Sequence, residues 1–129
     1  MITSTKIFHN KPFAHRQPNH EGHCRQIHGH NWAFKFTFAS HGGLDGNGFV
    51  VDFGGLGWLK SFLNEMFDHT LVLNLNDPEL EFLRDYIGKS DLAAIRCVPN
   101  CGAEGLAKYL FDTVNDMLSG RTEGRVYLT

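Results

Sequence analysis

The sequence predicts an α+β fold in which a four-stranded antiparallel sheet carries two helices on one face. The first observation behind this prediction is the run from His28 to Ala39, where bulky aromatic residues alternate with small or polar ones, as in a strand with one buried face. The second is that segments 56–67 and 103–118 carry apolar residues at helical spacing. The third is the length: 129 residues, 42% of them hydrophobic, suffice for one domain, residues 1–129.

Two further strands are expected in the first half of the chain. A first strand covers Thr3–His9 and is ended by Asn10–Pro12, and a loop rich in turn residues follows from Arg16 to Gln26. Four glycines between Ser40 and Gly48 predict a hairpin connection to a return strand, Phe49–Phe53.

The second half of the chain completes the predicted order of elements. Asp77–Glu79 has the pattern of a helix start with proline in the first turn, and it predicts a short helix towards Tyr86. Strands are expected at Ala93–Val98 and at Arg125–Thr129. An open sheet leaves its edges exposed, which predicts pairing with further copies of the chain.

Composition excludes several classes of protein. A formal charge of −2, from 12 basic and 14 acidic residues, gives no electrostatic case for binding nucleic acid or an anionic membrane. No basic start is followed by a long apolar run, so neither secretion nor membrane insertion is predicted. Three cysteines, an odd number, do not form a disulfide framework, and a cytoplasmic location is expected.

Histidines are unusually concentrated near residue 25. Five of the eight fall within sixteen residues: His15, His20, His23, His28 and His30. On a strand, His28 and His30 project from the same face with Cα atoms roughly 6.5 Å apart, a span that one metal ion can bridge. With His15 upstream as a third imidazole, the pattern is typical of a zinc site with one coordination position left open for catalysis.

A polar strand end with surface histidines is the alternative interpretation of this pattern. His20 and His23 could also compete as metal ligands. Both lie in the loop that contains Pro18, Asn19 and Gly22, where solvated histidines are the more ordinary outcome.

Other residues could carry acid–base chemistry. Cys24 lies four residues before His28, and a thiol close to a metal and imidazoles can act as a base or nucleophile. In Asp68–His69, a carboxylate beside a histidine can fix the imidazole tautomer, although a surface pair at a helix end is the usual explanation. Glu104 fits a first-turn acid favoured by the helix dipole.

The order of motifs resembles a known enzyme family. F-A-H-R, C-x3-H-G-H-N, G-F-V-V-D-F, F-D-H-T-L-x-L-N and A-E-G-L-A-K-Y-L occur here in the order found in 6-pyruvoyltetrahydropterin synthases and bacterial 6-carboxytetrahydropterin synthases. The resemblance covers nearly the whole chain. The cysteine-to-histidine spacing looks more like that of the carboxy-forming branch.

This resemblance implies a tunnelling fold (T-fold), in which sheets from three subunits close into a barrel and two trimers stack into a hexamer. It implies that His15, His28 and His30 bind one zinc per subunit, and that Cys24, Asp68 and His69 are catalytic. Glu104 falls at a position near the pterin. The implied reaction converts 7,8-dihydroneopterin triphosphate to 6-carboxy-5,6,7,8-tetrahydropterin with release of acetaldehyde and triphosphate, a step towards queuosine.

The chain also departs from the family pattern. The threonines that commonly precede the helical glutamate are replaced by Gly102 and Ala103. The glutamate that anchors the pterin normally follows the strand that begins at Arg125, whereas this sequence ends at Thr129, so either the sequence is truncated at this strand or the protein binds the pterin differently. Two alternatives to the carboxy-forming reaction stay open. One is 6-pyruvoyltetrahydropterin synthesis, and the other, suggested by the missing glutamate, is a catalytically silent protein that binds zinc or a pterin.

Overall fold

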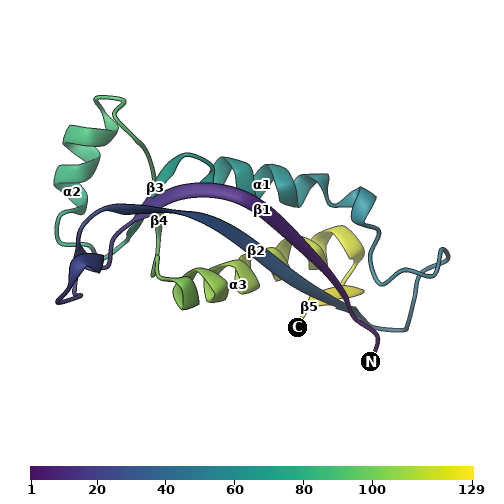
Figure 1. Ribbon diagram of the computed structural model, residues 1–129. Coiled ribbons are helices and arrows are strands. Elements are labelled where there is room, and N and C mark those ends of the chain that lie inside the picture. Colours follow the sequence, from purple (N-terminus) through teal and green to yellow (C-terminus); the bar gives the residue numbers. More distant parts are fainter.

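A long, curved β-hairpin dominates the computed structural model, which describes residues 1–129 (Figure 1). Its strands, β1 (Ser4–His15) and β2 (His28–Ser40), pair in antiparallel fashion. Three short strands complete one sheet in the order β4-β3-β1-β2-β5: β3 (Thr70–Asn74), β4 (Ala94–Val98) and β5 (Val126–Leu128). The β1–β3 and β3–β4 pairs are parallel, so the sheet is mixed.

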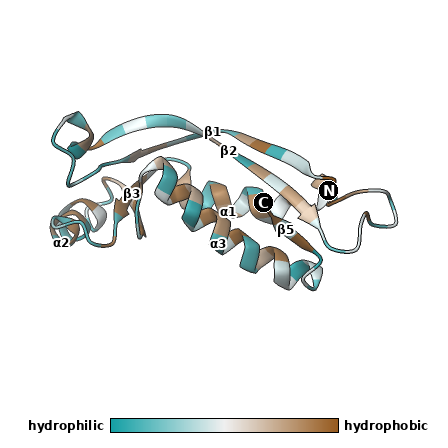
Figure 2. Ribbon diagram, turned by 90° about the horizontal axis from the view of Figure 1, so that it is seen from below, coloured by the Kyte–Doolittle hydropathy of each residue, from teal (hydrophilic) through white to brown (hydrophobic).

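The two long helices lie on the same face of this sheet. They are α1 (Gly57–Phe67) and α3 (Ala103–Thr122), and the opposite face of the hairpin carries no helix (Figure 2). A short helix, α2 (Leu80–Phe82), continues into a π-helical turn, Leu83–Gly88, at the end of the molecule near β3 and β4 (Figure 1). The predicted helices and the last strand are confirmed to within a few residues.

The core forms where the aromatic face of β2 meets the helices. Phe34, Phe36 and Phe38 are buried, whereas Ala33 and Lys35 on the other face are exposed, as the alternation predicts. The helices contribute leucines and a phenylalanine to the same cluster: Leu59, Leu63 and Phe67 from α1, and Leu106, Leu110 and Leu118 from α3.

The predicted four-stranded antiparallel sheet is wrong in strand number and in direction, because the structure has a five-stranded mixed sheet. The strand that sequence reasoning missed is β3. All five of its residues are buried, so it shows no alternation of apolar and polar residues. It pairs in parallel with β1 on one side and with β4 on the other, so it lies between β4 and the β1–β2 hairpin.

The predicted return strand at Phe49–Phe53 is also wrong. The Asp45 carboxylate accepts hydrogen bonds from the amides of Asn47 and Phe49, which holds a loop instead. Asp52 then caps a 3-10 turn at Phe53–Gly55. At the end of β2 that leads into this loop, both edges are already paired: β1 lies along one edge, and β5 pairs with residues 38–40 on the other.

The first strand continues beyond its predicted end at His9. Asn10 adopts a positive φ of 57°, and the register with β2 shifts between Phe8 and Lys11. This bulge absorbs the irregularity next to Pro12, so pairing resumes and continues to His15. The extension has a direct consequence for the histidines, since it places His15 opposite His28.

Candidate metal centre

Strand pairing brings three imidazoles together at one end of the hairpin. His15 pairs with His28, and His30 pairs with Phe13, so all three side chains project from one face. Their ring centroids lie 4.6, 4.9 and 5.4 Å apart, and one nitrogen from each ring lies within 4.8 Å of the others. The cluster could therefore hold a single metal ion.

The cluster lies at the end of the aromatic face. The Trp32 ring is 5.1 Å from the His15 ring and 5.4 Å from the His30 ring, measured between centroids, and it stacks on Phe13 at 4.6 Å. His15 is buried, His28 is half-buried and His30 is exposed. One side of the cluster is therefore packed and the other is open to a ligand.

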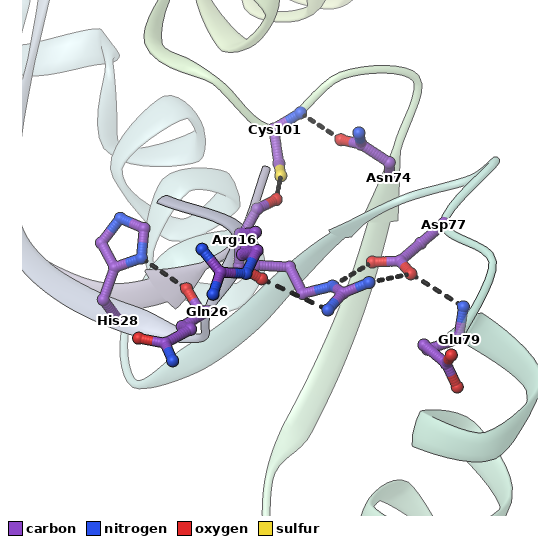
Figure 3. Close-up of polar contacts among 8 residues, drawn as sticks. Arg16, Gln26, His28, Asn74, Asp77, Glu79 and Cys101 are labelled. Carbon is purple, nitrogen blue, oxygen red and sulfur yellow. Dashed lines mark hydrogen bonds and ion pairs between the residues drawn. The ribbon is translucent and has the colours of Figure 1, made fainter. Parts of the chain in front are cut away.

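Backbone carbonyls fix the orientation of two of the rings. His15 Nδ1 lies 2.7 Å from the carbonyl oxygen of Cys101. His28 Nδ1 lies 2.7 Å from the carbonyl oxygen of Gln26, as Figure 3 shows. Because a carbonyl only accepts, each Nδ1 donates its proton, which leaves the Nε2 lone pair free for a metal.

The environment of His15 favours the neutral ring. Burial lowers its pKa, the hydrogen bond to Cys101 raises it, and the neighbouring His28 and His30 lower it, with a net shift below the ordinary value. A neutral imidazole is the form that binds a metal. Three imidazoles with an open side match the donor set of a catalytic zinc site. This burial and ordering argue against a mere cluster of surface histidines.

The competing histidines lie elsewhere. Neither His20 nor His23 belongs to the cluster, and His20 Nδ1 instead accepts the amide hydrogen of Gly22. Cys24 lies in a 3-10 turn, His23–Arg25, where its carbonyl accepts the amide hydrogen of Gln17 at 2.7 Å. Its thiol is partly buried and does not belong to the histidine cluster within one chain.

Asp68 and His69 form the pair that the sequence suggests. His69 Nδ1 lies 2.7 Å from Asp68 Oδ1, and the His69 side chain is 83% exposed. His69 has a positive φ of 59°, and its amide donates to the Pro12 carbonyl, which ties the pair to β1. His69 and His30 border the same shallow depression of about 480 Å³. Glu104 lies exposed in the first turn of α3.

Four residues around the cluster were missed as site residues. Arg16 donates two hydrogen bonds to the fully buried Asp77 carboxylate. Cys101 bonds His15 through its carbonyl and Asn74 through its amide, the latter drawn with the Arg16–Asp77 pair in Figure 3. Burial raises the pKa of the Cys101 thiol, so the group stays protonated. Asn74 and Arg16 do occur in the conspicuous motifs, but nothing local in the sequence indicates their partners.

Comparison with known proteins now decides the family. The profile of the family described as 6-pyruvoyl tetrahydropterin synthase matches residues 5–128. The chain belongs to this family. The resemblance seen in its motifs is thereby confirmed.

Curated relatives carry a more specific name, 6-carboxy-5,6,7,8-tetrahydropterin synthase. The protein of that name from Rickettsia bellii is 39% identical over 68 residues, which cover 52% of this chain and 49% of that protein. The one from Aquifex aeolicus is 31% identical over 96 residues, 74% of this chain and 59% of that protein. The chain thus spans about half the length of the curated relatives it matches.

A solved structure supports the fold. The crystal structure of an uncharacterized protein from Wolinella succinogenes superposes with a TM-score of 0.80 over 98% of this chain and 88% of that one. At 19% sequence identity, this likeness concerns the fold alone. Within the present chain, none of the helices combines the length and the apolar character needed to span a bilayer.

Proposed function

We propose that the protein is a zinc-dependent lyase that converts 7,8-dihydroneopterin triphosphate to 6-carboxy-5,6,7,8-tetrahydropterin, releasing acetaldehyde and triphosphate, in the cytoplasm and as a step towards queuosine. The observation that carries the proposal is the cluster of His15, His28 and His30, with ring nitrogens within 4.8 Å of one another, in a member of this family. The names of the curated relatives support the carboxy-forming reaction.

In this proposal, each histidine has a defined part. His15, His28 and His30 hold the metal, and the carbonyls of Cys101 and Gln26 keep two of the rings turned with Nε2 towards it. When bound, zinc acts as a Lewis acid that polarises oxygens of the substrate side chain and makes the neighbouring C–H bonds more acidic.

Proton transfer falls to the side chains nearby. We assign Cys24 as the group that accepts and returns a proton as thiolate and thiol. His69 serves as the second acid–base group, because Asp68 accepts its Nδ1–H and so leaves Nε2 to exchange a proton with substrate. Glu104, at the exposed start of α3, contacts the pterin.

The proposal includes assembly into a hexamer, a dimer of trimers. β5 pairs only with Phe38, Ala39 and Ser40, so the outer edge of β2 beyond this segment has no strand beside it. Between this edge and α3 lies a mostly apolar cavity of about 330 Å³. Trp32 lines it, and its buried indole N–H has no hydrogen-bond partner within the chain. A second copy would cover this surface.

Product analysis tests the reaction. Zinc-loaded protein is incubated with 7,8-dihydroneopterin triphosphate, and pterins, acetaldehyde and triphosphate are quantified. Acetaldehyde formed together with the carboxylated pterin supports the proposal. Triphosphate without acetaldehyde would indicate 6-pyruvoyltetrahydropterin synthesis instead. Protein that binds a dihydropterin but turns over none would indicate the silent alternative.

A further inference from the structure

Cys101 makes three hydrogen bonds through three different groups. Its amide donates to Asn74 Oδ1 at 2.8 Å, and its thiol donates to the Arg16 carbonyl at 3.1 Å (Figure 3). Its carbonyl accepts from His15 Nδ1 at 2.7 Å. The residue is 0% exposed, so water does not compete for these bonds. Cys101 therefore holds the end of β1 at two adjacent residues, His15 and Arg16.

Asn74 supplies the fixed end of this arrangement. It is the last residue of β3, pairs with Val98 of β4 and is 8% exposed. Its backbone carbonyl accepts the amide hydrogen of Asp77, while its side-chain oxygen holds Cys101. Its main chain is thus tied into the sheet and into the following turn, which limits the positions from which its side chain can reach Cys101.

A continuous path of buried hydrogen bonds leads from β3 to the His15 ring. Without Asn74, the amide of Cys101 would lose its partner, and the segment between β4 and α3 would lose the hydrogen bond that ties it to β3. The carbonyl that selects the His15 tautomer belongs to the same residue and would be held less firmly. Substituting a residue that orients a metal-bound histidine typically weakens metal binding by about 10- to 100-fold.

We propose that Asn74 is a positioning residue for the metal centre: through the backbone of Cys101, it fixes the His15 ring with Nδ1 protonated and Nε2 directed at the metal. The thiol of Cys101 has the separate task of holding the Arg16 carbonyl. The inference rests on the proposed zinc site, and it adds an asparagine and a backbone carbonyl, far apart in sequence from His15, to that site.

The main test compares zinc affinity among variants. Asn74→Ala removes the acceptor, Asn74→Asp keeps an oxygen at Oδ1, and Asn76→Ala alters an exposed asparagine two residues away as the control. Zinc dissociation constants are measured by competition with a chromogenic chelator, after circular dichroism has shown each zinc-free variant to be folded. We expect about 10- to 100-fold weaker binding for Asn74→Ala, partial recovery for Asn74→Asp, and no change for Asn76→Ala. A folded Asn74→Ala protein with the parent dissociation constant would overturn the proposal.

A second measurement needs no substitution and no metal. The ¹⁵N shifts of the His15 ring in the zinc-free parent protein report which nitrogen carries the proton. We expect the Nδ1–H tautomer before zinc is added, and a proton on Nε2 would overturn the proposal even if Asn74→Ala does not fold. Should the parent protein bind no zinc, the proposed function fails while the tautomer of His15 still decides whether the ring is positioned as described.

Discussion

The three histidines differ in how firmly each is held. His15 is buried and bonded to a carbonyl in the loop before α3, His28 is bonded to a carbonyl two residues before it, and His30 is exposed. Part of the ligand set is thus oriented before a metal arrives, while one ligand remains free to adjust. Such an arrangement lowers the entropic cost of closing the site and keeps an accessible side for substrate.

A pair of substitutions separates metal binding from proton transfer. We expect His28→Ala to lose stoichiometric zinc, because two imidazoles remain. Cys24→Ala should keep zinc and lose about 10²- to 10⁴-fold in turnover, the usual size of an acid–base contribution. Zinc content is measured by mass spectrometry of the metal and turnover by product formation. His20→Ala, outside the cluster, is the control for both, and a Cys24→Ala enzyme with near-parent rate would sink the role given to the thiol.

The Arg16–Asp77 ion pair predicts a pH-dependent stability. Burial raises the pKa of Asp77, but the hydrogen bond and charge of Arg16 and the amide of Glu79 outweigh it, so the net pKa lies below its ordinary value. A carboxyl group whose pKa is lower in the folded protein than in the unfolded chain stabilises the fold when the pH is above the unfolded-chain pKa of about 4. This contribution is lost as the pH falls through the pKa of the folded state.

We therefore expect Asp77→Ala to lower the free energy of unfolding by about 3 kcal/mol at pH 7, since it leaves a partly buried arginine without its partner. The difference in free energy of unfolding between the variant and the parent protein should shrink below about pH 4, where Asp77 becomes protonated. Urea denaturation at a series of pH values measures this difference. A difference that stays constant with pH would contradict the stabilising role of the ionised pair.

At the scale of elements, the start of α3 depends on close packing. A Cβ on Gly105 would lie 2.6 Å from three atoms of Asn100, including its backbone oxygen, so a side chain there forces the helix away from the preceding loop. We expect Gly105→Ala to lower the free energy of unfolding by about 1–3 kcal/mol.

Gly120→Ala in the same helix is the control. A Cβ at Gly120 would have no atom within 4 Å, so this substitution should instead raise the free energy of unfolding by up to about 1 kcal/mol. Chemical denaturation of both variants compares them, and equal effects would contradict the packing argument.

Element boundaries were predictable where local pattern dominates. The alternation in β2 and the helical spacing in α1 and α3 reflect one buried face each, and the sequence contains that information. β3 was not predictable in this way, because a strand buried on both faces has no alternating pattern. The bulge in β1 was missed since its strand continues past residues that ordinarily end one.

At the scale of the whole molecule, the open edge of β2 and the apolar cavity beside α3 predict that copies of the chain associate. If they form the proposed hexamer, sedimentation velocity should report six times the 14.6 kDa chain mass. Phe111 is 46% exposed and lines the cavity. A charged side chain at this position should leave the single chain folded, because it faces solvent there, but it should weaken the contact with a second copy that buries it. Phe111→Glu is therefore expected to give smaller, folded species, with Phe111→Leu as the control. A hexamer unaffected by Phe111→Glu would place the interface elsewhere.

The sequence by itself determined the half of the metal centre that depends on local geometry. Side chains two apart on a strand share a face, so His28 and His30 follow from the spacing H-G-H alone. Only the tertiary structure decided the other half. The bulge at residues 9–10 sets the register that brings His15 opposite His28, and the carbonyl that orients His15 belongs to a residue 86 positions further along the chain. Register and long-range hydrogen bonds depend on how separate elements pack, which no local pattern records.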